Sequence, residues 1–133
     1  MQSKKKEVEE FLRDLKGFIG RKDFDIKRDF KVIAKPKPND LQHSTPHTVI
    51  ALDYDDSDVL RRINELTVEE YSETKIDNGD AHPPLLFVFG KVINGKLVYI
   101  KLKIREREKG RYILCVSFHF AREKMNFPYA NEK

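Results

Sequence analysis

The chain has 133 residues, of which 39% are hydrophobic and 36% charged, and its formal net charge is +4. A chain of this length builds a single compact core, so we expect one domain over residues 1–133. The sequence has no apolar run of about 20 residues and no apolar stretch behind its basic N-terminus, so we expect neither a membrane-spanning helix nor a secretory signal. The single Cys115 cannot form an internal disulfide, which favours a reducing, cytoplasmic location.

Charge is distributed unevenly along the chain. Residues 1–37 carry a net charge of +5, residues 38–83 carry −8 and residues 84–133 carry +7. Two basic segments of this kind are able to gather around a polyanion while the acidic segment faces away. The same blocks also act as ordinary solubilising charge, so charge alone leaves both interpretations open.

The first predicted element is a helix over residues 7–19, the main part of a basic N-terminal region that extends to residue 37. Its apolar side chains recur every three or four residues and form one stripe: Val8, Phe11, Leu12, Leu15, Phe18 and Ile19. Gly20 is expected to end this helix. Residues 31–34 are predicted to form a short extended segment, and the Pro, Asn and Ser content of residues 35–47 predicts a loop.

The main body of the domain is expected over residues 48–133, starting with a strand and a helix. The sequence HTVIALDY predicts a buried strand over residues 48–52, followed by a helix capped by Ser57 or Asp56. The apolar stripe of that helix is Val59, Leu60, Ile63 and Leu66. Residues 67–70 match a capping box, which predicts another helical turn, and a polar loop is expected after residue 71, over residues 72–84.

Three strands are predicted to follow, over residues 85–93, 96–104 and 111–120. The Asn-Gly pair at 94–95 is a strong signal for a two-residue hairpin turn between the first two strands. Such a turn pairs Gly90 with Tyr99 and Val88 with Lys101, and paired residues share a face of the sheet. The side predicted to be apolar carries Phe87, Phe89, Ile100, Leu102, Leu114, Val116, Phe118 and Phe120. The other side carries Ile113 and Cys115 together with a polar group, namely Gly90, Tyr99, Lys101, Ser117 and His119, in which Tyr99 lies opposite Ser117 or His119.

This polar group suits the cleavage of RNA without a metal ion. In that reaction the 2′-hydroxyl attacks the adjacent phosphate, so a protein must take one proton, supply another to the leaving 5′-oxygen and stabilise negative charge on the phosphoryl oxygens. The ordinary pKa of His119 suits either proton transfer. Lys101 is able to stabilise phosphate, Tyr99 to donate a hydrogen bond to it, and Gly90 to leave room for a nucleotide.

Four more residues are candidate RNA contacts. Ser117 and Lys103 belong to the same predicted face, and Arg61 and Arg62 lie on the predicted helix, where a guanidinium group is able to grip a phosphate with two hydrogen bonds. A solvated sheet face and a solvated helix face carry the same residue types in many proteins without any function. We therefore keep an ordinary solvent-facing surface as the alternative for all of these residues.

A metal site is not expected. His43 and His47 are four residues apart, which brings two ligands together only on a helix, and Pro46 argues against a helix there. A zinc site would also need further ligands, and Cys115 lies within an apolar strand. No cofactor is predicted either, since the sequence has no Gly-rich phosphate-binding loop.

Three stretches together resemble the MqsR family of bacterial toxins: TVIALDYDDSDVLRRI, FVFGKVINGKLVYIKLKI and ILCVSFHF. The resemblance extends from about Thr48 to Pro128, and its order and spacing carry it. Members of this family are small ribonucleases that cut mRNA in toxin–antitoxin pairs. The resemblance implies a RelE-like α+β fold, in which N-terminal helices pack on a small, mainly antiparallel, twisted sheet.

The resemblance also implies site residues and partners. The positions that it marks as functional are Arg61, Tyr99 and His119, where His119 replaces a Lys of the best-known members and so moves acid–base chemistry onto an imidazole. It implies mRNA as the substrate and a cognate antitoxin protein as the partner, and it leaves open whether cutting takes place on the ribosome. The alternative function is a non-catalytic module that binds RNA or protein through the same basic sheet face.

Overall fold

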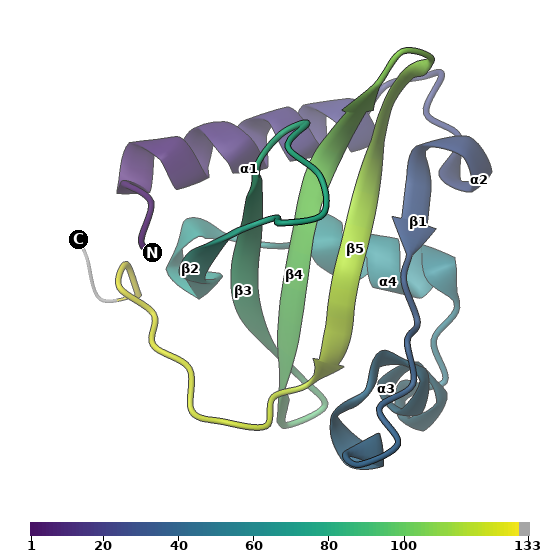
Figure 1. Cartoon of the computed structure of the whole chain (residues 1–133), viewed down its shortest axis with the longest axis vertical. Coiled ribbons are helices and arrows are strands. Elements are labelled where there is room, and N and C mark those ends of the chain that lie inside the picture. The colour runs from purple at the N-terminus through teal and green to yellow at the C-terminus, as the bar shows by residue number, and fades with distance from the viewer. Residues whose placement is uncertain (131–133) are drawn as a thin grey trace.

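The computed structural model describes residues 1–130, which form a layer of helices packed on a five-stranded mixed sheet (Figure 1). In chain order the elements are α1 (Lys5–Ile19), α2 (Ile26–Asp29), β1 (Phe30–Val32), η1 (Leu41–His43), α3 (Thr45–Leu52), α4 (Asp56–Asn64), η2 (Val68–Glu70), β2 (Tyr71–Ile76), β3 (Leu85–Ile93), β4 (Lys96–Arg107) and β5 (Gly110–Phe120). The strand order is β1-β5-β4-β3-β2, with β1 parallel to β5 and the other pairs antiparallel. The predicted α+β fold with a mainly antiparallel sheet is confirmed. Among the described residues, no helix has both the length and the apolar composition that crossing a bilayer requires.

Helix α1 matches its prediction closely. Its buried stripe includes Val8 and Leu15, and the ring of Phe11 stacks on that of Phe87 in β3 with a centroid distance of 4.1 Å. The amide of Gly20 donates to the carbonyl of Lys16 at 2.9 Å, where the helix ends. Helices α1 and α4 cover the same face of the sheet and pass behind the strands in Figure 1. The opposite face, which carries Tyr99, Lys101 and His119, is called the open face below.

The strand predicted over residues 48–52 is wrong, because these residues belong to helix α3. Ser44 caps this helix by accepting a hydrogen bond from the amide of His47 at 3.3 Å, and Pro46 lies in its first turn, where a missing N–H costs nothing. A short apolar run cannot be assigned to strand or helix from periodicity alone. The next helix, α4, is capped by Asp55, whose carboxylate accepts from the amide of Asp58 at 3.1 Å, and not by Asp56 or Ser57.

The polar loop predicted over residues 72–84 is shorter than expected, since β2 occupies its first part. Strand β2 pairs with β3 along the sheet edge and buries Thr74 completely. The N-terminus completes that edge, because the amide of Thr74 donates to the carbonyl of Met1 at 2.8 Å. Charged side chains on an edge strand concealed this element from sequence reasoning. The capping box at Thr67 and Glu70 is confirmed, and the short helix η2 follows it.

The three successive strands and the Asn94–Gly95 turn are confirmed. Asn94 and Gly95 have φ angles of 52° and 79°, as the predicted type of turn requires, and Gly90 pairs with Tyr99. A bulge changes the third strand: Lys101 pairs with Ser117, but the next residue, Leu102, pairs with Cys115. The residue between them, Val116, has no partner across the ladder.

The bulge reverses the predicted faces of β5 before residue 117. Ile113 and Cys115 lie in the core, whereas Leu114 pairs with Lys103 on the open face. The prediction that Leu114 and Val116 line the apolar side is therefore wrong. Burial raises the pKa of the Cys115 thiol to about 12, so this group is an inert part of the core. Phe118 and His119, beyond the bulge, keep the faces predicted for them.

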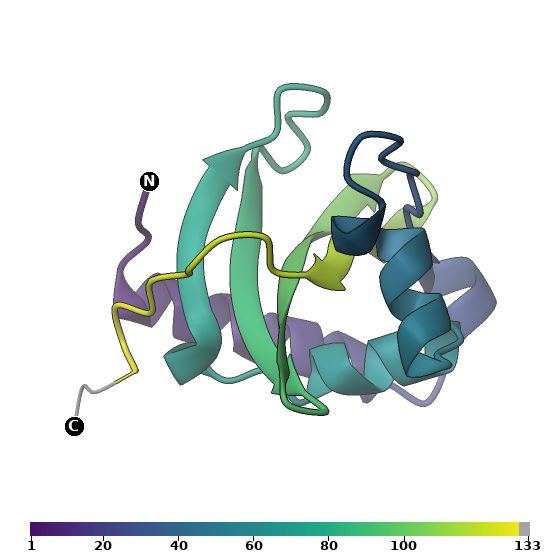
Figure 2. The ribbon, with the colours of Figure 1, turned by 90° about the horizontal axis from the view of Figure 1, so that it is seen from below.

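The first residues of the chain and the segment around Tyr129 meet at the edge strand β2. The hydroxyl of Tyr71 lies 2.6 Å from that of Thr74, which lies 2.6 Å from that of Ser3, and Tyr129 donates to the carbonyl of Ser3 at 2.6 Å. The rings of Tyr71 and Tyr129 also stack, with centroids 5.8 Å apart. This buried network fixes the far end of the segment that follows β5, which crosses the sheet on its way there (Figure 2).

Candidate active site

The open face brings Tyr99 and His119 into direct contact. They are paired residues of β4 and β5, and their rings stack with centroids 5.0 Å apart and an interplanar angle of 12°. The sequence left the partner of Tyr99 open between Ser117 and His119, and the structure selects His119. Lys101 lies two residues along β4 on the same face, paired with Ser117. Of the predicted polar group, these four residues are brought together.

His119 is held as a neutral imidazole with a defined proton. Its Nδ1 lies 3.0 Å from the carbonyl oxygen of Phe120, which can only accept, so Nδ1 carries the hydrogen. Its Nε2 lies 3.4 Å from the ammonium of Lys37, which can only donate, so Nε2 presents a lone pair. Burial lowers the pKa of His119 below its usual 6.5, and the charges of Lys37, His43 and Lys101 lower it further. The side chain is therefore prepared to accept a proton at Nε2.

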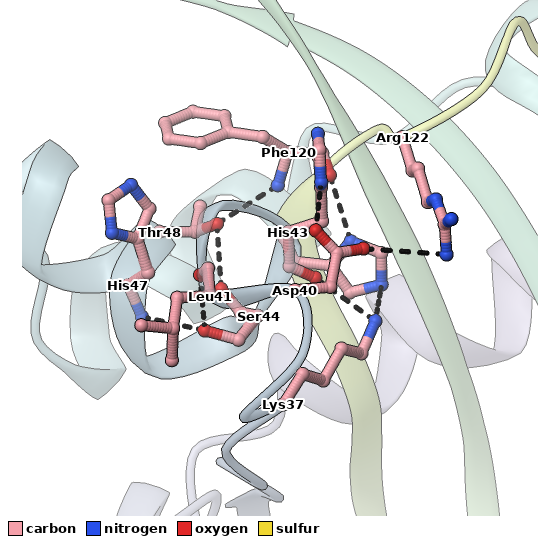
Figure 3. Close-up of polar contacts among 10 residues, drawn as sticks. Lys37, Asp40, Leu41, His43, Ser44, His47, Thr48, Phe120 and Arg122 are labelled. Atoms are coloured by element: carbon pink, nitrogen blue, oxygen red, sulfur yellow. Dashed lines mark hydrogen bonds and ion pairs between the residues drawn. The ribbon is translucent and has the colours of Figure 1, made fainter.

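The segment between β1 and α3 contacts His119 through Lys37. It supplies residues that sequence reasoning missed (Figure 3). The ammonium of Lys37 also donates to the carbonyl of His43 at 3.0 Å. Asp40 connects His43 and Arg122, with its carboxylate 2.6 Å from His43 Nδ1 and 3.6 Å from Arg122 Nη1. The hydrogen bond from His43 lowers the pKa of Asp40, which stays ionised. Lys37 lies between Pro36 and Pro38, and these two prolines predict only a loop.

Helix α3 positions the backbone on both sides of His119. Strand β1 pairs with β5 only as far as Val32. Farther along β5, helix α3 packs against β5 where β1 would otherwise continue. The hydroxyl of Thr45 accepts a hydrogen bond from the amide of Phe118 at 3.1 Å. The hydroxyl of Thr48 accepts one from the amide of Phe120 at 2.9 Å (Figure 3). Both threonines are buried, so His119 is held between two fixed amides. The sequence TPHT contains this signal, but the predicted loop over residues 35–47 and strand over residues 48–52 divide it, whereas all four residues belong to α3.

Tyr99 and His119 line a groove of about 810 Å³ on the open face. Its other walls come from β2 and from the segment after β5: Ser72, Glu73, Lys75, Ala121, Arg122, Glu123, Lys124, Met125, Asn126, Phe127 and Pro128, with Met1 and Gln2 at one end. Burial and the charge of Glu73 raise the pKa of Tyr99, so its hydroxyl stays a hydrogen-bond donor. Burial and the nearby charges of Lys75 and Lys37 lower the pKa of Lys101. The groove is large enough for a nucleotide and contains a donor, a base and several cations.

Gly90 does not leave room for a nucleotide. It pairs with Tyr99 as predicted, but the segment after β5 crosses it, and a Cβ placed on Gly90 would lie 2.7 Å from Cζ of Phe127 and 3.0 Å from Sδ of Met125. The space beside Tyr99 is therefore filled by the protein itself. This glycine allows the close approach of the segment that forms one wall of the groove.

We expect Gly90→Ala to lower the free energy of unfolding by about 1–3 kcal/mol, because the methyl group has no room beneath Phe127. Chemical denaturation measures this change. Gly17→Ala is the matched control: apart from the adjacent backbone of α1 and the two neighbouring residues, no atom lies within 4 Å of its Cβ position, so the same substitution is expected to stabilise by roughly 1 kcal/mol. Combining Gly90→Ala with Phe127→Ala should cost less than the two single changes together. A fully additive double variant would show that Phe127 does not pack on Gly90.

Lys103 is not available to bind RNA. Only 1% of its surface is exposed, and its ammonium forms ion pairs with Asp77 and Asp80 and donates to the carbonyl of Pro83 at 3.1 Å. Burial opposes ionisation of Asp80, yet Lys103 and Arg105 lower the pKa of that carboxyl to about 2. Lys103 instead fastens the loop between β2 and β3 onto the sheet.

Arg61 and Arg62 lie far from the groove, on the covered side of the sheet. Helix α4 packs into the core with Ile100 and Phe118, whose neighbours Tyr99 and His119 point the opposite way. Arg61 pairs with Asp58 at 3.5 Å, and Arg62 donates to the hydroxyl of Tyr54 at 2.8 Å. The structure does not bring either arginine to the site, and Lys37 provides the cation beside His119 instead.

The two histidines considered as metal ligands also separate. His43 lies in η1, and its ring contacts the carboxylate of Asp40. His47 lies in α3, and its ring packs edge-on against the ring of Phe120, with centroids 6.2 Å apart. Within residues 1–130, no group of three or more His, Cys, Asp or Glu side chains is arranged to hold a metal ion.

Comparison of the chain with protein-family models, curated proteins and solved structures finds no match in any of the three.

Proposed function

We propose that this protein is a metal-independent endoribonuclease that cuts single-stranded RNA by attack of a 2′-hydroxyl on the adjacent phosphate. The observation that carries this proposal is the environment of His119. Its Nε2 lone pair lies beside an ammonium group, its ring stacks on Tyr99, and both rings line a groove wide enough for a nucleotide. These are the parts that RNA cleavage without a metal requires.

In the proposed reaction His119 is the general base. When RNA enters the groove, the flexible Lys37 side chain moves from Nε2 to the phosphate, and Nε2 takes the proton of the 2′-hydroxyl. The 2′-oxygen forms a bond to phosphorus while the bond from phosphorus to the 5′-oxygen breaks. The products are a 2′,3′-cyclic phosphate and a free 5′-hydroxyl. The carbonyl of Phe120 stabilises the imidazolium that forms, because it accepts the hydrogen on Nδ1.

Lys37 supplies both charge and the second proton. Its ammonium stabilises the phosphoryl oxygens as negative charge develops and gives a proton to the leaving 5′-oxygen. Because it returns to within 3.4 Å of Nε2, the imidazolium is then able to pass its proton back and restore both groups. Tyr99, whose hydroxyl stays protonated, donates to the phosphate or orients the 2′-hydroxyl. Lys101 adds positive charge from the same face.

We propose further that this ribonuclease acts as the toxin of a toxin–antitoxin pair, with mRNA as its substrate and a cognate antitoxin as its inhibitor. The support for this step is the resemblance to the MqsR family, together with the presence of Tyr99 and His119 at the positions that the resemblance marks. Arg61, the third such position, is not part of the site proposed here. Inducing the chain alone in bacteria is then expected to stop growth, and a binding module without activity is not expected to do so.

The test is incubation of the purified protein with a mixed-sequence single-stranded RNA in EDTA. We expect discrete fragments that end in 2′,3′-cyclic phosphate, and no cleavage of the same sequence made as 2′-O-methyl RNA, which lacks the attacking group. Intact RNA, both alone and with ribosomes added, would contradict the proposal. RNA that stays intact but binds in a salt-dependent manner would identify the non-catalytic module instead.

A further inference from the structure

A second basic surface lies at the other end of the open face. Helix α2 and strand β1 come from the basic N-terminal region, and the β4–β5 hairpin comes from the basic C-terminal region (Figure 1). The parallel pairing of β1 with β5 brings them side by side. Their side chains line a hollow of about 450 Å³, made of Lys27, Arg28, Phe30, Lys31, Arg105, Arg107 and Tyr112. We call this hollow the hairpin-end basic surface.

Much of the positive charge on this surface has no internal partner. Arg28 and Arg105 are held in ion pairs, with Asp29 and Asp80 respectively. Lys27, Lys31 and Arg107 are exposed, and none of them forms an ion pair with any residue in the range 1–130. Three free cations in one hollow repel one another, and a bound polyanion relieves that repulsion.

The hairpin-end basic surface continues the sheet face that carries the candidate active site. Lys31 pairs with Leu114, which pairs with Lys103, so Lys31 is on the open face. Tyr99, Lys101, Lys103, Arg105 and Arg107 alternate along β4 and share that face, and the loop between β2 and β3 lies over Lys103. Arg107 is eight positions from Tyr99, or about 26 Å at roughly 3.3 Å per strand residue. A stacked single strand rises about 3.4 Å per nucleotide, so roughly eight nucleotides connect the two places.

We propose that the hairpin-end basic surface binds the backbone of the same RNA strand that is cut at His119, several nucleotides from the cleaved bond. This inference rests on the proposed ribonuclease function and extends it to a second site on the substrate. An aromatic ring among the cations favours RNA over an acidic protein. The guanidinium of Arg107 lies over the ring of Tyr112, 6.0 Å from its centroid, and Arg105 donates a hydrogen bond to the hydroxyl of Tyr112 at 3.0 Å. Cations interleaved with an aromatic ring match phosphates and bases together.

The test compares two triple variants with identical changes in residue type. The first, Lys27→Gln with Lys31→Gln and Arg107→Gln, removes the free cations of the hairpin-end basic surface. The second, Lys6→Gln with Arg13→Gln and Lys16→Gln, removes three exposed cations from α1, on the covered side of the sheet. Binding is measured by fluorescence anisotropy over a range of salt concentrations, with an uncleavable 2′-O-methyl RNA of about 16 nucleotides.

We expect the first variant to bind this RNA about 10- to 100-fold more weakly near 0.1 M salt. The slope of log affinity against log salt should fall by about 2 in magnitude, because three cations are removed. The α1 variant should change neither the affinity nor the slope. In cleavage assays the first variant should raise KM for the RNA of about 16 nucleotides but not for one of about three, which is too short to reach the second site. Equal effects of the two triple variants, or none, would overturn the proposal. Unchanged RNA binding with weaker binding of polyglutamate would assign the surface to an acidic protein and overturn it too. A third outcome separates the two proposals. If the parent protein cuts no RNA but the first variant binds RNA more weakly than the parent, the surface is an RNA-binding site and the ribonuclease function is refuted.

Discussion

Replacing His119 with alanine is expected to slow the cleavage of single-stranded RNA in EDTA by about 10²- to 10⁴-fold, the usual contribution of a general base or acid. The reason is geometric: His119 lines the groove, and its Nε2 is an uncharged acceptor because the hydrogen bond to Phe120 keeps the proton on Nδ1. Single-turnover rates on one defined RNA measure the effect without interference from product release.

The matched control is His82→Ala, which removes a histidine from the loop between β2 and β3. Its side chain is 79% exposed, so the substitution should leave both the rate and the stability unchanged. Thermal unfolding of the His119→Ala variant checks that the fold survives, since the change also leaves the carbonyl of Phe120 without its partner. A folded His119→Ala variant that cuts RNA at the parent rate would remove this residue from the mechanism.

That Tyr99 and His119 share a face of the sheet was within reach of sequence reasoning, because it depends on local geometry. Their direct pairing was not, because the longer turn between β4 and β5 left Ser117 and His119 as equal candidates. The Asn94–Gly95 turn sets the register of β3 and β4, and alternation along each strand then assigns the faces. The bulge between Ser117 and Cys115 was not within reach, because one extra residue reverses the faces on its far side and leaves no mark in an apolar strand. His119 was placed correctly because it lies beyond that bulge.

Lys37 shows why the rest of the candidate site was hidden. It meets His119 across 82 positions of sequence, and that contact exists only because β1 runs parallel to β5 and aims the following segment at the end of β5. Burial by other segments was equally invisible. Lys103 and Gly90 belong to the predicted face, but a loop covers the first and the C-terminal segment covers the second. Residue type and strand parity predict which way a side chain points, and they do not predict what lies on top of it.

Replacing Lys37 with methionine is expected to have two separate effects on the same reaction. The first is a fall of about 10²- to 10³-fold in the maximal rate, because the phosphate loses its charge stabilisation and the leaving 5′-oxygen loses its proton donor. The second is a shift of the acid limb of the pH–rate profile. Cleavage requires neutral His119, so the rate falls as the pH drops through the pKa of His119, which burial and neighbouring cations place below 6.5.

Removing the positive charge of Lys37 makes protonation of His119 easier, so its pKa rises and the acid limb moves to higher pH. Lys35→Met is the matched control, since Lys35 is exposed two residues away and forms no ion pair or side-chain hydrogen bond with any of residues 1–130. The Lys35→Met variant should change neither the maximal rate nor the position of the acid limb. A Lys37→Met variant with the parent rate would show that this ammonium only covers the base. A limb that moves to lower pH would contradict the charge coupling between the two side chains, and with it the assignment of His119 as the base beside Lys37.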